Sequence, residues 1–172
     1  MDAKERHEML ARLEQGRTAL LAALKGVSEE TAARAPGEGK WSILGCVEHM
    51  GVSEDYLFSQ IEAATESETP LTNETREGKM LAFGADRSRR IESPPEGHPK
   101  GIFATLPVAV DHFLASRKRT EEFVATCRED LRSKATWHPI LGKANSHEML
   151  LSIAVHCQRH VQQIEEIKAA IG

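Results

Sequence analysis

NSHEMLLSIAVHCQRHVQQIEEIKAA occupies residues 145–170 of the chain. Its apolar residues recur at steps of three and four, the period of one face of an α-helix. Asn145 is followed three residues later by Glu148, the pattern of a capping box, which favours a helix start at this point. We therefore predict a helix from Asn145 to Ala170, ending before Gly172.

Other stretches of the chain show the same helical period. Ser42 and Ser28 are typical N-cap residues, so each favours a helix start. No stretch alternates apolar and polar residues as a half-buried strand does, and we predict an all-α protein. The predicted helices preceding residue 145 span about 3–23, 28–34 (a short piece), 42–64 and 106–131.

Residues 65–105 separate the second and third long helices. They hold four of the seven prolines, Pro70, Pro94, Pro95 and Pro99, and show only a weak helical pattern, from Thr72 to Phe83. A long crossover allows the helices on either side of it to run parallel, which short loops forbid. We predict one domain over residues 1–172: an all-α four-helix bundle with a long crossover between its second and third long helices.

The charge balance argues against nucleic acid as a partner. The chain has 172 residues, with 22 Lys and Arg against 26 Asp and Glu, a formal net charge of −4. A negative protein is repelled by phosphate backbones. We expect the two basic runs, Arg87-Ser88-Arg89-Arg90 and Arg117-Lys118-Arg119, to be solvated surface. Aromatic residues make up only 5%, which leaves little material for stacking bases.

The first residues lack the apolar region of a secretory signal. The longest apolar runs are far shorter than the roughly 20 residues needed to cross a bilayer. The three cysteines, Cys46, Cys127 and Cys157, show no C-x-x-C spacing, which favours a reducing compartment over a disulfide scaffold. We predict a cytoplasmic protein without a membrane segment.

The histidines are the candidate functional residues of this sequence. His156 and His160 occupy successive positions in the seam of the last helix, where Leu or Ile is expected. A buried imidazole without a partner costs about 1–3 kcal/mol, and residues four apart share a helix face. His49 of the second long helix is the candidate for a third ligand. Three imidazoles and one open position form a known catalytic metal geometry, and spacing alone gives this interpretation about even odds against ordinary core or surface histidines.

The other histidines have plainer interpretations. We expect His7, His98 and His147 at the surface and His138 in a loop, while His112 faces either inward or outward. Several known metal sites are excluded, because the sequence contains no Glu-x-x-His, no H-E-x-x-H and no C-x-x-C-H.

Two motifs resemble those of a known family. WSILGCVEHM at 41–50 resembles the entry to the second long helix of the DinB-like (YfiT-like) metal-binding superfamily. HPILG at 138–142, followed by His156-x-x-x-His160-x-x-Gln163, resembles its last loop and last helix. The resemblance implies an up-down-down-up bundle, often homodimeric, whose divalent metal is bound by His49, His156 and His160.

The resemblance also implies a range of functions. Characterised members include thiol S-transferases that use bacillithiol, mycothiol or glutathione, and a mycothiol-dependent maleylpyruvate isomerase. Others are named metal-dependent hydrolases without an assigned reaction. We therefore expect a metal-dependent enzyme acting on a small molecule, with zinc, nickel or iron, and with either water or a low-molecular-weight thiol as the activated nucleophile.

The polar neighbours of this site could equally be structural or solvated, and the sequence singles out no general base. One alternative is a non-catalytic metal-binding or small-molecule-binding module of a stress response. Another is a structural bundle whose histidines only form hydrogen bonds. The candidate pocket neighbours are Cys46, Ser53, Tyr56, Asp111 and Gln163.

Overall fold

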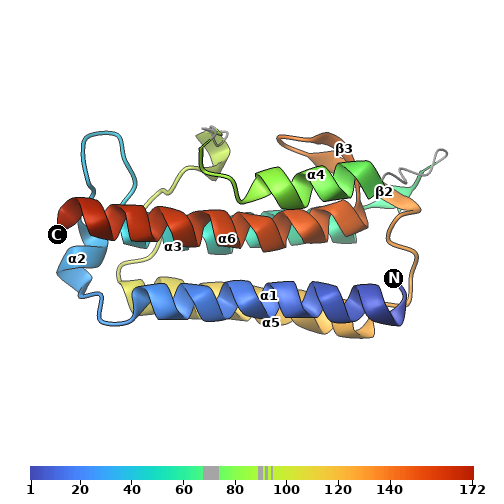
Figure 1. Ribbon diagram of the computed structural model, residues 1–172, viewed down its shortest axis with the longest axis horizontal. Coiled ribbons are helices and arrows are strands. Elements are labelled where there is room, and N and C mark those ends of the chain that lie inside the picture. Colours follow the sequence, from blue (N-terminus) through green and yellow to red (C-terminus); the bar gives the residue numbers. More distant parts are fainter. Residues whose placement is uncertain (68–73, 89–90, 92, 94) are drawn as a thin grey trace.

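Four long helices dominate the structure, a computed structural model that describes residues 1–67, 74–88, 91, 93 and 95–172. α1 and α5 form one layer, and α3 and α6 form the other (Figure 1). α3 and α5 run in the same direction, opposite to α1 and α6 (Figure 1). The predicted up-down-down-up four-helix bundle is therefore confirmed. The four helices are α1 (Ala3–Leu24), α3 (Ile43–Glu62), α5 (Leu106–Thr126) and α6 (Ser146–Ile171).

Side-chain caps set the starts of the helices. The Asn145 side chain accepts a hydrogen bond from the Glu148 amide at 2.7 Å, and the Glu148 carboxylate accepts one from the Asn145 amide at 3.0 Å. The predicted capping box is therefore present. Ser42 caps α3, and Ser28 caps the short helix α2 (Glu29–Ala33), each through the amide three residues on.

A small antiparallel sheet, which the sequence did not predict, closes one end of the bundle. β1 (Thr65–Glu66) pairs with β2 (Lys134–His138), which pairs with β3 (Gly142–Asn145). The strands are too short and too polar to show an alternating apolar pattern. The prediction of no strands was wrong for this reason.

The predicted third helix was too long at its C-terminal end. α5 ends at Thr126 and is capped by Cys127, rather than continuing to Leu131. A turn follows, in which the Asp130 side chain accepts a hydrogen bond from the Arg132 amide. Leu131 is buried, so its burial comes from this turn and not from the stripe of the helix.

The crossover contains the helix α4 (Glu74–Gly84) and the 3-10 turn η1 (Pro95–Gly97). α4 packs against α6 (Figure 1), in agreement with the weak helical pattern read from the sequence. Thr72 of that pattern, Pro70, Pro94 and two arginines of the first basic run (residues 89–90) lie outside the described residues.

The core has two apolar clusters separated by a polar layer. The layer consists of Glu54, Arg117 and Thr120, all buried. Our prediction of a solvated basic run was therefore wrong for Arg117, whose guanidinium is fully buried, whereas Lys118 is exposed. Representative members of the two clusters are Leu13, Leu57 and Val124 on one side of the layer and Leu20, Met50 and Phe113 on the other.

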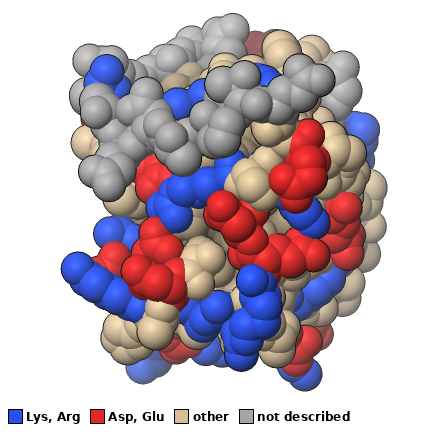
Figure 2. All heavy atoms as spheres, turned by 90° about the vertical axis from the view of Figure 1, so that its right-hand side faces the viewer, with Lys and Arg blue, Asp and Glu red and all other residues tan. Residues whose placement is uncertain are grey.

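The end of the bundle at which α1 begins carries acidic and basic side chains side by side (Figure 2). Arg132 forms ion pairs with Glu5 and Glu77, and Glu77 also lies 3.0 Å from His147 Nδ1. His147 is 5% exposed, so the prediction that it lies at the surface was wrong. Its partner Glu77 lies on α4, far away in the sequence.

Within the described residues, no helix combines the length and the apolar character that crossing a lipid bilayer requires.

Candidate metal centre

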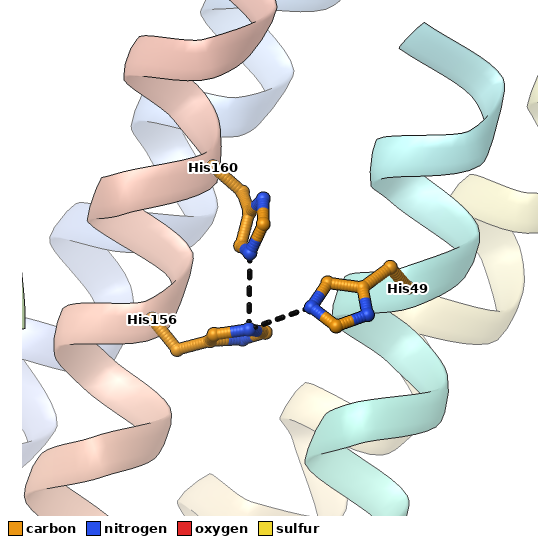
Figure 3. Close-up of side chains that lie close together, drawn as sticks. All are labelled: His49, His156 and His160. Atoms are coloured by element: carbon orange, nitrogen blue, oxygen red, sulfur yellow. Dashed lines mark hydrogen bonds between the residues drawn. The ribbon is translucent and has the colours of Figure 1, made fainter. Parts of the chain in front are cut away.

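Three imidazoles from two helices meet in the middle of one layer of the bundle. His49 lies on α3, and His156 and His160 lie on successive turns of α6 (Figure 3). His156 Nε2 is 2.9 Å from His49 Nε2 and 3.0 Å from His160 Nε2. Among the described residues, these three histidines form the one group of at least three potential metal ligands whose ligand atoms all lie within 4.8 Å of one another.

Burial keeps these imidazoles neutral. His49 and His160 are 5% and 6% exposed, and His156 is partly buried. Burial lowers the pKa of His49 to about 4. It also lowers the pKa values of His156 and His160 well below 6.5, and the neighbouring imidazoles add to the effect. A neutral imidazole is the form that binds a metal ion.

Two of the rings are oriented by oxygen atoms on their far side. The Nδ1 of His49 lies 2.5 Å from the Gly97 carbonyl oxygen, and the Nδ1 of His160 lies 2.8 Å from Gln163 Oε1. Both oxygens only accept hydrogen bonds, so each ring carries its proton on Nδ1. The Nε2 atoms of His49 and His160 are therefore left with lone pairs.

The proton count of the cluster matches a cation site. His156 Nε2 can offer at most one proton, and it has two lone pairs within 3.0 Å. One of the two close contacts therefore lacks a proton. A metal ion bound by all three nitrogens removes that mismatch, and tetrahedral zinc with Zn–N bonds of about 2.0–2.1 Å would place the nitrogens about 3.3 Å apart. The three residues therefore fit a divalent ion.

The structure brings two of the five candidate pocket neighbours to the cluster. Gln163 contacts His160, and Ser53 Oγ lies 3.3 Å from His49 Nδ1. Cys46 is fully buried in the apolar core and is not part of the convergent group. Tyr56 and Asp111 are exposed, and neither has a described contact with the three histidines.

Two neighbours were not predicted from the sequence as parts of the site. The Trp41 ring lies 4.7 Å from the ring of His49 and 5.9 Å, almost parallel, from that of His160. Arg87 donates to Gln163 Oε1 at 3.4 Å and is paired with Glu166 of α6. The available signal for Trp41 was its place in the WSILGCVEHM motif, because Trp41 precedes the N-cap Ser42 and helical spacing does not apply to it. Arg87 left no comparable signal.

The remaining histidines lie outside the cluster. His7 and His98 are exposed, as predicted, and His112 is half-buried with its Nε2 2.9 Å from Asp55. His138 ends β2 and is 7% exposed, so the expectation of a loop position was wrong. Its Nδ1 accepts hydrogen bonds from two amides of the β2–β3 turn.

Comparison with known proteins places the chain in a family. The model of the DinB superfamily matches residues 12–164. The chain belongs to the DinB superfamily. A curated relative, the uncharacterized protein YuaE of Bacillus subtilis (strain 168), is 23% identical over 152 residues, covering 86% of this chain and 90% of YuaE.

Solved structures of DinB-like shape support the same fold. YfiT from Bacillus subtilis superposes with a TM-score of 0.66 at 14% identity, covering 100% of this chain and 90% of YfiT. YfiT is described as a "probable metal-dependent hydrolase with an unusual four-helix bundle topology". A conserved protein from Enterococcus faecalis superposes with a TM-score of 0.68 at 16% identity, covering 99% and 98% of the two chains. At these identities the similarities show the fold alone.

Proposed function

We propose that this protein is a divalent-metal-dependent enzyme that acts on a small molecule. The observation that carries the proposal is the meeting of three neutral imidazoles whose Nε2 atoms share at most one proton between two close contacts. Membership of the DinB superfamily and the description of YfiT as a probable metal-dependent hydrolase support it.

His49, His156 and His160 would hold the ion, and three protein ligands are typical of catalytic rather than structural zinc. When bound, a divalent ion supplies Lewis acidity, which lowers the pKa of a nucleophile and polarises an electrophile. The Gly97 carbonyl and Gln163 orient two of the ligands. Trp41 covers these two rings with its indole and keeps water from that side.

The two buried cysteines of α3 and α6 do not supply the nucleophile. Cys46 and Cys157 are buried thiols, and burial raises their pKa values to about 12 and about 11. Both are therefore protonated at neutral pH and unreactive. We infer that the nucleophile comes from solution, as water in a hydrolase or as a low-molecular-weight thiol in a thiol S-transferase.

Elemental analysis of protein purified without a histidine tag tests the metal centre. We expect about one equivalent of zinc, nickel or iron per chain, and we expect His156→Ala and His160→Ala to lose it. The melting temperature should rise with added Zn²⁺ in the wild type and not in these variants, because a ligand bound only by the native state stabilises it. His7→Ala, at an exposed position, is the control. Unchanged metal content in both cluster variants would refute the site.

Activity assays then separate the reaction classes. The metal-loaded protein is assayed with simple esters, and with a low-molecular-weight thiol plus an electrophile. Turnover that disappears in His160→Ala supports the enzyme and identifies its class. Tight binding of a small molecule without turnover would favour the alternative, a non-catalytic binding module.

A further inference from the structure

Glu48, the residue before the ligand candidate His49, is buried with 3% exposure. Its carboxylate accepts hydrogen bonds from three successive backbone amides, those of Lys100 at 2.5 Å and of residues 101 and 102 at 3.0 Å each. Hydrogen bonds to a charged acceptor are about twice as strong as neutral ones. Glu48 therefore anchors the end of the crossover to α3.

The same stretch of backbone also contacts His49. We call residues 97–102 the strap. Gly97 begins it, and the Gly97 carbonyl accepts the His49 Nδ1 proton. The strap also packs closely against α3 at Gly45, where an added Cβ would lie 3.4 Å from the Pro99 ring.

Two adjacent residues of α3 thus bind the two ends of one short strap. Glu48 fixes amides 100–102, and the ring of His49 contacts the carbonyl of residue 97. Only His98 and Pro99 separate Gly97 from Lys100. The proline restricts the backbone of both residues, so a shift at Lys100 is passed on to Gly97. The position of the Gly97 carbonyl therefore depends on the Glu48 carboxylate.

We propose that Glu48 is a positioning residue of the metal centre. By anchoring the strap it holds the Gly97 carbonyl against His49 Nδ1, which keeps the His49 proton away from Nε2 and directs that lone pair at the ion. The inference rests on the proposed function, since it assigns Glu48 a role at the same site. Loss of a group that orients a ligand typically costs 10–100-fold in metal affinity.

The test compares Glu48→Gln with Glu29→Gln. Both remove a carboxylate that accepts from backbone amides, but Glu29 holds the Leu106 amide at the start of α5, beyond the strap. Co²⁺ is the probe, and its affinity is measured by competition with a chelator. We expect Glu48→Gln to bind Co²⁺ roughly 10–100-fold more weakly and to alter its visible absorption spectrum, whereas Glu29→Gln leaves both unchanged.

A second readout needs no metal. ¹⁵N NMR of the metal-free protein reports which nitrogen of His49 carries the proton; we expect Nδ1 in the wild type and a mixture in Glu48→Gln. Glu48→Asp keeps the charge but shortens the side chain by one methylene, so it should loosen the strap and reproduce both effects if Glu48→Gln does not fold. Wild-type affinity, spectrum and tautomer in the folded Glu48 variants would overturn the inference alone. Absence of Co²⁺ binding by the wild type would overturn the proposed function as well.

Discussion

Glu54 and His49 are both buried polar side chains of α3, but their hydrogen bonding differs. The Glu54 carboxylate accepts from Arg117 at 2.8–3.1 Å and from Thr120 at 2.7 Å, while the remaining Arg117 nitrogen donates to the Leu13 carbonyl at 2.8 Å. Each Arg117 nitrogen and the Thr120 hydroxyl therefore has an acceptor within hydrogen-bond distance. His49 Nε2 instead contacts His156 Nε2, which also contacts His160 Nε2, and at most one proton is available for these two contacts.

The difference distinguishes a structural polar site from a site that can bind a cation. A buried polar group whose hydrogen bonds are complete holds helices in register, whereas a cluster with unmatched lone pairs is prepared for a cation. Glu54, Arg117 and His156 line the same small internal gap, which has no room for a water molecule. The two polar sites are therefore neighbours separated by dry packing, and they can be altered one at a time.

The largest effect should come from breaking the polar layer. Arg117→Met leaves the Glu54 carboxylate buried without a counter-ion, and such a loss costs about 3–5 kcal/mol of unfolding free energy. Urea denaturation of the metal-free protein measures it. We expect the double variant Glu54→Leu/Arg117→Met to regain most of the loss, because no buried charge remains.

Lys118→Met is the matched control for that prediction. Lys118 is adjacent in sequence but exposed, and surface substitutions usually change stability by about 0.5 kcal/mol or less. Equal stability of Arg117→Met and Lys118→Met would show that the polar layer is not what holds α3 and α5 together.

Helical periodicity predicted the bundle because each long helix buries a continuous stripe. The same argument placed His156 and His160 in the interior, since they interrupt a stripe of Leu and Ile. It could have found the polar layer too. Glu54 lies four residues after Met50 and three before Leu57, so it stands at a seam position of its helix. Arg117 does so too, four residues after Phe113. Its place in a basic run led instead to the prediction of a solvated surface.

The features that sequence reasoning missed depend on contacts between distant parts of the chain. His147 is buried by its contact with Glu77, 70 residues earlier. His49 is oriented by the carbonyl of Gly97, 48 residues later, and a backbone carbonyl has no sequence signature. The three paired strands are two, five and four residues long, too short for a periodic pattern. Local spacing therefore predicts which residues point inward, but not which partner each one meets.

His138 provides an intermediate case, a buried histidine whose Nδ1 accepts hydrogen bonds from two backbone amides. Burial, with a smaller effect from Arg76, lowers its pKa from 6.5 to about 4. Below pH 6.5 the unfolded chain takes up a proton that the folded protein does not accept until about pH 4. This residue therefore lowers the unfolding free energy by roughly 2 kcal/mol between pH 7 and pH 5.

His138→Asn tests that assignment. The Asn oxygen can still accept from the amides of Ile140 and Leu141, which now donate to His138 Nδ1 at 3.1 Å each, but it does not titrate. Urea unfolding of the metal-free variant at pH 7 and pH 5 should show a pH dependence weaker by that amount, with stability near the wild-type value at pH 7. A slope equal to that of the wild type would place the acid sensitivity elsewhere.

The smallest expected effect concerns the orientation of a single ligand. Gln163 Oε1 accepts the His160 Nδ1 proton, and Gln163→Leu removes that acceptor, so the proton can move to Nε2 and compete with the ion. We expect Zn²⁺ affinity, measured by chelator competition, to fall about tenfold, with little change in the stability of the metal-free protein.

Gln163→Glu keeps an acceptor and adds negative charge beside the ring, so it should retain or increase the affinity. Gln162→Leu, on the exposed neighbouring residue, controls for the change in helix propensity. An affinity loss shared by both leucine variants would mean that the orientation of His160 does not depend on Gln163. The contrast between the hydrogen-bonded polar layer and the proton-poor histidine cluster would then rest on the three imidazole rings alone.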